Sequence, residues 1–296
     1  MEYKEISIRD IYGIRIGQVE DSEGKTGLTL IMSEAGMPAG LDISGGGPAS
    51  RETALLDPVA HAESINGVLL GGGSAFGLDA AGGVLQYMEE HGIGFDVGVT
   101  KVPLVCQSDI FDLPVGDFRA RPDKAMGYAV CEAAMEGNYQ DGPFGAGCGA
   151  TVGKSRGFDS CFPSGVGSYA LRIGDLIVGA VVVVNAYGDI YDFKTGELVA
   201  GHGDAVDALG TGFGFNTTIG CVITNAVFDK TKLCKMASMA QDGLARCIRP
   251  VHTNLDGDSI YAVSVGDVKA DLNFVGSLAA DVMSEAILKA VRYVGK

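Results

Sequence analysis

The chain has 296 residues, of which 47% are hydrophobic, and it carries a formal net charge of −15. This is enough apolar material for the core of one large or two ordinary domains. Because a strongly acidic chain offers no broad basic surface to phosphate groups, we expect neither nucleic acid nor an anionic membrane as a partner.

The N-terminal stretch MEYKEISIRD lacks the positive and apolar regions of a secretory signal, and no apolar run is as long as a membrane span. A cytoplasmic location is therefore expected. The seven cysteines are scattered and never spaced C-x-x-C, which favours reduced thiols over disulfides or a zinc site. The four histidines show no H-E-x-x-H or paired spacing, so we expect no metal site.

The first predicted unit is a short strand, a glycine turn and a helix, in GVLLGGGSAFGLDAAGGVLQYMEEHG (67–92). A glycine turn of this kind can bind a pyrophosphate. Here the spacing Gly71-x-Gly73-x-x-x-Gly77 differs from G-x-G-x-x-G, and Ser74 stands one residue short of the G-x-S-x-G nucleophile motif. We therefore interpret the glycines as structural ones that let a helix pack closely on a sheet, and we expect no cofactor.

A second helix is predicted over 123–137. Residues 166–193 hold two β-rich runs joined by a turn at Gly174 and Asp175, then a further strand, which predicts an antiparallel sheet rather than repeated βαβ units. The C-terminal third is predicted as strand 218–226, helix 230–248, strand 259–265 and helix 271–294, with Asp271 as the N-cap of the last helix. Helices with one apolar face lying on antiparallel sheets indicate stacked layers.

The stretch GFGFNTTIGCVITNA (212–226) places two threonines, Thr217 and Thr218, at the start of a buried strand. Threonine is a good strand former, so β-propensity alone explains the pair. A functional interpretation needs a second group near these hydroxyls.

The stretch HTNLDGDSIYAVSVG (252–266) offers such a group, because Asp256 and Asp258 stand immediately before another apolar strand. Residues i and i+2 of an extended segment point the same way, so both carboxylates can face one site. A calcium loop would need further carboxylates at fixed spacing, which are missing here. Two interpretations remain open: a solvated turn, or carboxylates that hold the amine of a hydroxyl nucleophile.

These two segments belong to a longer pattern. Together with DISGGGPASRET, GVLLGGGSAFGLDAAGGV, VPLVCQSDIFDLP and GAGCGATVGK upstream, they closely resemble the P1 (DmpA-type) family, in the same order from about residue 10 to the C-terminus. That family contains L-aminopeptidase/D-esterases, β-aminopeptidases and 6-aminohexanoate-oligomer endohydrolases. The resemblance implies an α/β (α+β) fold, a four-layer αββα sandwich like that of the ornithine acetyltransferases, and a precursor that cuts itself before its Ser or Thr nucleophile.

Carried onto this sequence, the resemblance makes residues 1–296 a single domain that is cut at the bond between Asn216 and Thr217 into chains 1–216 and 217–296. Thr217 would then be the nucleophile, and its free α-amino group, with a reference pKa of roughly 7.7 to 8.0, could act as its base without a histidine. The glycine-rich GTGFGF before the cut can bend the peptide for attack.

The resemblance assigns the remaining catalytic roles. Asp256 and Asp258 would orient the Thr217 ammonium, Asn185 would donate a hydrogen bond to the oxyanion, and Lys154 would lie near the nucleophile.

The resemblance also implies substrate-binding residues, for which we name Phe111, Gly73 and Ser74. Some family members place a tyrosine in the segment of Phe111. Since phenylalanine cannot donate a hydrogen bond, we expect weaker assistance to the oxyanion or to precursor cleavage, or a different donor.

The sequence thus predicts a self-processing N-terminal-threonine hydrolase for small peptides, amino-acid amides or esters, assembled as a homotetramer. The alternatives are an acyltransferase of the ornithine-acetyltransferase type, and an uncut member of the family that has lost catalysis. The stereochemistry of the substrate, whether L-, D-, β- or ω-amino acid, stays open.

Overall fold

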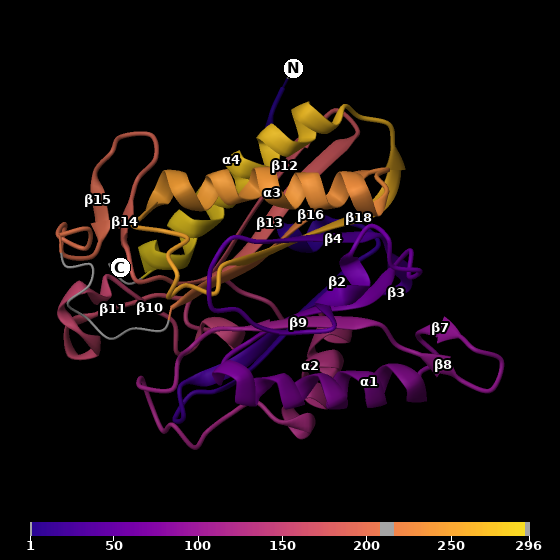
Figure 1. The fold of residues 1–296 in the computed structure, drawn as a ribbon. Coiled ribbons are helices and arrows are strands. Elements are labelled where there is room, and N and C mark those ends of the chain that lie inside the picture. Colours follow the sequence, from indigo (N-terminus) through magenta and orange to yellow (C-terminus); the bar gives the residue numbers. More distant parts are fainter. Residues whose placement is uncertain (1, 208–215, 294–296) are drawn as a thin grey trace.

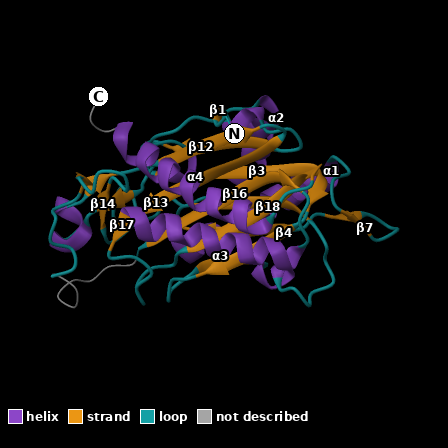
Figure 2. Cartoon of the chain, turned by 90° about the horizontal axis from the view of Figure 1, so that it is seen from above, coloured by secondary structure: helices purple, strands orange, loops and turns teal. Residues whose placement is uncertain are grey.

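The computed structural model describes residues 2–207 and 216–293, and these form the four-layer αββα sandwich that was expected (Figure 1). One outer layer holds helices α3 (Lys230–Cys247) and α4 (Leu272–Arg292). The other holds α1 (Ala81–Glu90) and α2 (Lys124–Glu136). Two β-sheets lie between them, and α3 and α4 lie side by side over the first sheet (Figure 2).

The first sheet has six strands, in the order β1 (Lys4–Ile6), β12 (Val166–Ile173), β13 (Leu176–Asn185), β16 (Thr217–Ala226), β18 (Ser259–Val268) and β4 (Ala39–Ile43). The predicted antiparallel pairing is confirmed for β12 and β13, which turn at Gly174 and Asp175. Strands β16 and β18 pair in parallel, which the sequence analysis did not anticipate. Helix α3 lies between them in the chain and provides the crossover that a parallel pair needs.

The second sheet has five strands, in the order β2 (Arg15–Asp21), β3 (Thr26–Met37), β6 (Ile65–Gly71), β9 (Val105–Asp109) and β5 (Ala49–Arg51). The smaller strands are β7 (Phe95–Asp96), β8 (Lys101–Val102), β10 (Thr151–Val152), β11 (Phe162–Pro163), β14 (Asp189–Tyr191), β15 (Leu198–Ala200) and β17 (Ile248–Arg249). Short 3₁₀ helices span Ile8–Asp10, Thr53–Leu56, Ser74–Ala80, Gly145–Gly147, Lys154–Arg156 and Phe158–Ser160.

Three apolar clusters fill the three spaces between the layers. Strand β13 is buried along its whole length, since helices cover one face of its sheet and the second sheet covers the other. Its side chains accordingly alternate, with Val182 and Val184 on the helical side and Val181 and Val183 between the sheets. Polar residues at the ends of such strands therefore lie at the edge of a dry interior.

The helix starts follow the sequence signals. Asp271 Oδ1 accepts hydrogen bonds from the backbone N–H groups of Asn273 and Phe274, which confirms it as the N-cap of α4. Asp123 and Asp229 cap α2 and α3 in the same way. Within residues 2–207 and 216–293, no helix combines the length and the apolarity needed to cross a bilayer.

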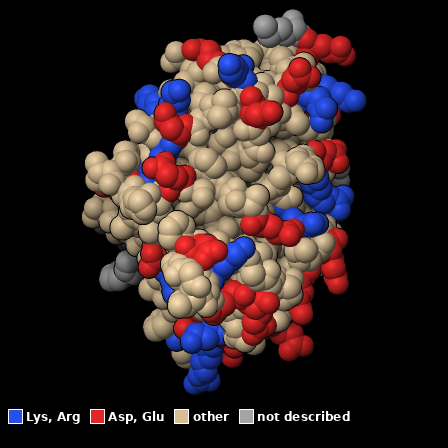
Figure 3. Space-filling view, turned by 90° about the vertical axis from the view of Figure 1, so that its right-hand side faces the viewer, with Lys and Arg blue, Asp and Glu red and all other residues tan. Residues whose placement is uncertain are grey.

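One face of the molecule shows how the charges are distributed. Acidic and basic side chains are interspersed around uncharged surface, and this face carries no continuous basic area (Figure 3).

Candidate active site

Two strand ends bring polar residues together. Thr217, the first residue of β16, is the register partner of Asn185, the last residue of β13, and both are buried. Because the strands are antiparallel, the start of one lies opposite the end of the other. The predicted nucleophile and the predicted oxyanion donor therefore lie on adjacent strands at one end of the six-stranded sheet.

The peptide bond before Thr217 has two groups on its carbonyl oxygen. The Thr217 hydroxyl donates to the Asn216 carbonyl oxygen at 2.5 Å, and the Gly257 backbone N–H donates to the same oxygen at 2.8 Å. Asn216 also pairs with the 255–257 segment through its own N–H, which donates to the Leu255 carbonyl at 3.1 Å. The Thr217 hydroxyl and the Gly257 N–H thus both donate to one carbonyl oxygen, and a backbone N–H at this position could also stabilise an oxyanion.

Sequence reasoning missed the Gly257 donor, because a backbone N–H has no side-chain signature. Its one signal is the glycine between the two aspartates. A Cβ at Gly257 would stand 2.8 Å from Thr217 Oγ1 and 2.8 Å from the Gly47 carbonyl oxygen. Only glycine lets the chain approach the hydroxyl this closely.

The two predicted carboxylates make separate contacts, and it is Asp258 that contacts the start of β16. Asp258 Oδ1 accepts from the Thr218 backbone N–H at 2.7 Å, and its Oδ2 accepts from the ring Nδ1 of His252 at 2.8 Å. Asp256 Oδ2 instead accepts from the backbone N–H and hydroxyl of Thr253, at 2.8 and 2.6 Å. Burial, together with the charge of Asp258, raises the pKa of Asp256.

Lys154 and Asn185 form a buried polar pair. Lys154 Nζ donates to the Asn185 side-chain and backbone oxygens, at 2.9 and 3.0 Å, and the Thr151 N–H also donates to Asn185 Oδ1 at 3.1 Å. With its oxygen so engaged, the Asn185 amide group donates to the Phe111 carbonyl at 3.0 Å. The Asn185 side chain is thus held in a fixed orientation.

The burial of Lys154 has an electrostatic consequence. Desolvation lowers its pKa to about 7, although the nearby Cys161, Asp256 and Asp112 oppose that change. A lysine with this pKa exchanges its proton near neutral pH, which suits acid and base chemistry.

Of the predicted substrate-binding residues, Phe111 lies beside this pair. Phe111 is half-buried, with its ring centroid 6.3 Å from that of Phe158, and Lys154 Nζ lies 5.6 Å from the Phe158 ring. The two rings give the site an apolar wall. Gly73 is more distant: its N–H donates at 2.7 Å to Asp112, whose charge also acts on Lys154.

The glycine turn is structural, as interpreted, but for a different reason. A Cβ at Gly72 would lie 2.0 Å from Asp112 Oδ2, so this glycine makes room for a buried carboxylate. Ser74 has a positive φ of 54° and donates its N–H to the Ile110 carbonyl at 2.9 Å. The close helix packing instead comes later, where a Cβ at Gly83 of α1 would meet the Lys124 carbonyl of α2 at 1.8 Å.

The loop of the DISGGGPASRET motif covers the carboxylate segment. The N–H groups of Ser44 and Gly47 donate to the backbone carbonyls of Asp258 and Asp256, at 3.0 and 2.9 Å. The glycine-rich run expected to bend the scissile peptide, residues 210–215, lies outside the described residues.

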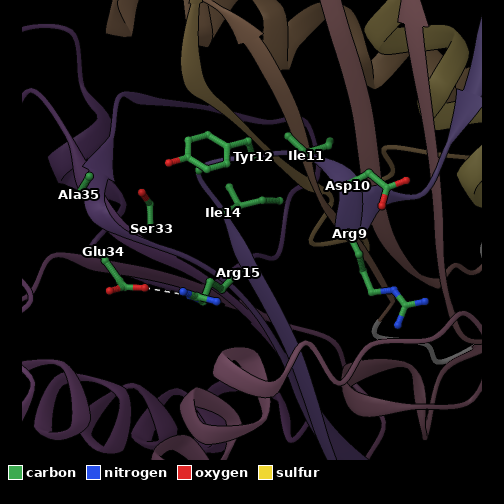
Figure 4. A pocket seen from close by; sticks show the side chains of 10 residues that line it. Arg9, Asp10, Ile11, Tyr12, Ile14, Arg15, Ser33, Glu34 and Ala35 are labelled. Atoms are coloured by element: carbon green, nitrogen blue, oxygen red, sulfur yellow. Dashed lines mark hydrogen bonds and ion pairs between the residues drawn. The ribbon is translucent and has the colours of Figure 1, made fainter.

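A groove of about 450 Å³ occurs elsewhere on the surface, lined by residues 9–15 and 33–35 (Figure 4). Arg15 Nε donates to Glu34 Oε1 across it at 2.8 Å. None of its lining residues is a predicted site residue, so we place the candidate active site at Thr217 and not in this groove.

Comparisons with known proteins agree with the fold described above. The chain matches the model of peptidase family S58 over residues 7–294. An uncharacterized aminopeptidase of Mycobacterium leprae (strain TN) is 37% identical, over 96% of this chain and 90% of the relative. A 6-aminohexanoate-oligomer endohydrolase of Agromyces sp. (strain KY5R) is 30% identical, over 95% of this chain and 84% of the relative.

Among solved structures, the L-aminopeptidase D-Ala-esterase/amidase of Ochrobactrum anthropi, described as a variant of the Ntn hydrolase fold, superposes with a TM-score of 0.73. The alignment covers 96% of this chain and 85% of that chain at 18% sequence identity. The two proteins share a fold.

Proposed function

Because the chain belongs to peptidase family S58, we propose that it is a self-processing hydrolase whose nucleophile is an N-terminal threonine, Thr217. The precursor would cut itself between Asn216 and Thr217 into chains 1–216 and 217–296. The processed protein would then hydrolyse small peptides, amino-acid amides or esters. The relatives named aminopeptidase and 6-aminohexanoate-oligomer endohydrolase support a substrate with an amide bond.

The observation that carries this proposal is the contact at the Asn216 carbonyl, where the Thr217 hydroxyl and the Gly257 N–H meet one oxygen. In the precursor, the hydroxyl oxygen would attack the carbonyl carbon, and the oxyanion would stay against the Gly257 N–H. The carbon–nitrogen bond then breaks, the amine of Thr217 takes up a proton, and the acyl group stays on the threonine oxygen as an ester. Water hydrolyses that ester and frees the hydroxyl.

In the processed protein, the Thr217 hydroxyl would attack the substrate carbonyl in the same place. The new α-amino group and Lys154 could each act as a base near neutral pH, the first because of its reference pKa and the second because burial lowers its pKa to about 7. Asp258, which accepts from the Thr218 N–H, would orient that amine together with Asp256. Asn185 would hold Lys154 and the adjoining strand end in register.

The test is the denatured intact mass of purified protein, followed by N-terminal sequencing of any fragment. We expect a fragment that begins Thr-Thr-Ile-Gly in the wild type, partial cutting and activity in Thr217→Ser, and neither in Thr217→Ala. An uncut Thr217→Ala protein with full amidase activity would end the proposal. In keeping with the family resemblance, we also propose a cytoplasmic homotetramer of processed protomers, which native mass spectrometry can test.

A further inference from the structure

His252 stands beside the candidate active site in an unusual backbone conformation. Its φ is +55°, in the left-handed region that few residues with a Cβ adopt. This conformation turns both its backbone N–H and its ring Nδ1 toward a single oxygen, Asp258 Oδ2, at 3.2 and 2.8 Å. The histidine therefore holds the carboxylate with two donors.

The other oxygen of that carboxylate faces the nucleophile's strand. Asp258 Oδ1 accepts from the Thr218 N–H at 2.7 Å. Thr218 is one residue from the position where a cut would create a new amine. One carboxylate thus connects the imidazole of His252 to the backbone next to Thr217.

The pair is buried unevenly. The Asp258 side chain is 2% exposed and that of His252 is 21% exposed, but the second ring nitrogen of His252, Nε2, is itself buried and has no hydrogen-bond partner among the described residues. Burial lowers the pKa of His252, but the hydrogen bond and charge of Asp258, the backbone carbonyl of Gln241 and the charge of Asp256 outweigh it, and the pKa is raised.

Other charged groups lie one step away from the pair. Lys154, from the 3₁₀ helix Lys154–Arg156, acts electrostatically on Asp256. Gln241 of α3 donates its side-chain N–H to Asp42 of β4, at 3.1 and 3.2 Å from the backbone and carboxylate oxygens. His252 contacts Asp258 directly, and its pKa is raised above the ordinary value of a histidine.

We propose that His252 is a positioning residue for the proposed threonine hydrolase: it holds the Asp258 carboxylate against residues 217 and 218, and its protonation sets how much of that carboxylate's charge is left for the Thr217 amine. The inference rests on the proposed function. When the imidazole is protonated, two cations share one carboxylate, so the amine loses its proton at a lower pH. When the imidazole is neutral, the whole charge of Asp258 stabilises the ammonium.

This coupling predicts the shape of the pH profile. Activity needs a neutral amine, and the pKa of that amine rises as His252 loses its own proton. The acid limb of kcat/KM against pH should therefore be shallower than one ionisation in the wild type.

The variant that separates position from titration is His252→Asn. Asparagine adopts positive φ readily, and its side-chain amide can still donate to Asp258, but it carries no titrating proton. We expect it to process normally and to show an acid limb of one ionisation, moved to higher pH by about half a unit or more. His252→Ala, which removes the donor, should lower kcat about tenfold and leave KM nearly unchanged.

The control is His91→Asn, at the exposed C-terminus of α1, which should leave the profile unchanged. A wild-type profile retained in His252→Asn would overturn the inference. If that variant fails to fold, the wild-type pH profile alone tests the inference, because a wild-type acid limb that fits one ionisation would also overturn the inference. A wild-type protein that stays uncut and inactive would instead count against the proposed function, so the two failures are distinguishable.

Discussion

Gly257 and Thr217 are in such close contact that a Cβ on the glycine would stand 2.8 Å from the threonine hydroxyl oxygen. Real Cβ atoms essentially never come closer than 3.0 Å to a neighbour, so either the hydroxyl or the 255–257 segment would have to move. Either movement disturbs the Gly257 N–H that donates to the Asn216 carbonyl.

Gly257→Ala should therefore slow self-cleavage, by on the order of tenfold to a hundredfold, as expected when an oxyanion donor is displaced. The measurement is the disappearance of intact precursor over time by denaturing mass spectrometry. Gly47→Ala is the matched control, because a Cβ there meets nothing closer than 3.9 Å. Equal cleavage rates in the two variants would remove the role given to this N–H.

The two aspartates should differ in importance. Asp258 contacts both the Thr218 N–H and His252, whereas Asp256 contacts Thr253 in its own turn. Asp258→Asn should lower kcat on the order of a hundredfold, since it weakens charge-assisted contacts beside the nucleophile, and Asp256→Asn about tenfold or less. Steady-state kinetics on processed protein gives the comparison, and a larger loss in Asp256→Asn would reverse the assignment.

Lys154 should leave a signature in stability against pH. An unfolded lysine titrates near 10.4, whereas burial lowers the pKa of Lys154 to about 7. Between these values the unfolded state binds more protons, so the free energy of unfolding rises with pH, by up to about 1.4 kcal/mol per pH unit from this one group.

Lys154→Met should lack this contribution and gain stability relative to the wild type as the pH falls from about 9.5 toward 7.5. Urea unfolding in an uncut Thr217→Ala background keeps both proteins as single chains. Parallel stability curves for the two proteins would show that Lys154 is charged in the folded state.

Phe111→Tyr tests whether the missing phenol matters. The sequence predicts weak oxyanion assistance or a different donor, and the Gly257 N–H is such a donor. We therefore expect the tyrosine to change the self-cleavage rate by less than about threefold, against the tenfold or more that an oxyanion donor is worth. A much faster cut in Phe111→Tyr would make the phenol, and not the glycine, the main group.

Most helix boundaries, and the stacking of helices on sheets, could be predicted because they depend on side-chain patterns that the sequence displays, whereas the four-layer arrangement was expected from the family resemblance. Asp271 as an N-cap is an example, and the strand predicted over 218–226 begins one residue earlier, at Thr217. The parallel pairing of β16 with β18 could not, since periodicity gives the face of a strand and not its partner.

The site was predicted less completely for similar reasons. Gly257 acts through its backbone, and His252 acts through a left-handed conformation that spacing does not encode. The i and i+2 rule predicted that Asp256 and Asp258 face one site. In the structure Asp256 instead accepts hydrogen bonds from Thr253 in a local turn, so the two carboxylates have different partners.

Strand β16 lies inside the six-stranded sheet, with β13 on one side and β18 on the other. A cut before Thr217 would therefore create two polypeptides that remain interlocked, because the new N-terminus belongs to a strand held along both edges. Folding of the uncut chain is a unimolecular reaction, whereas recovery from denatured fragments would need two chains to meet. Self-cleavage would then make folding hard to reverse. The protein would fold as one chain before the cut, and refolding after the cut would depend on the concentration of the two fragments.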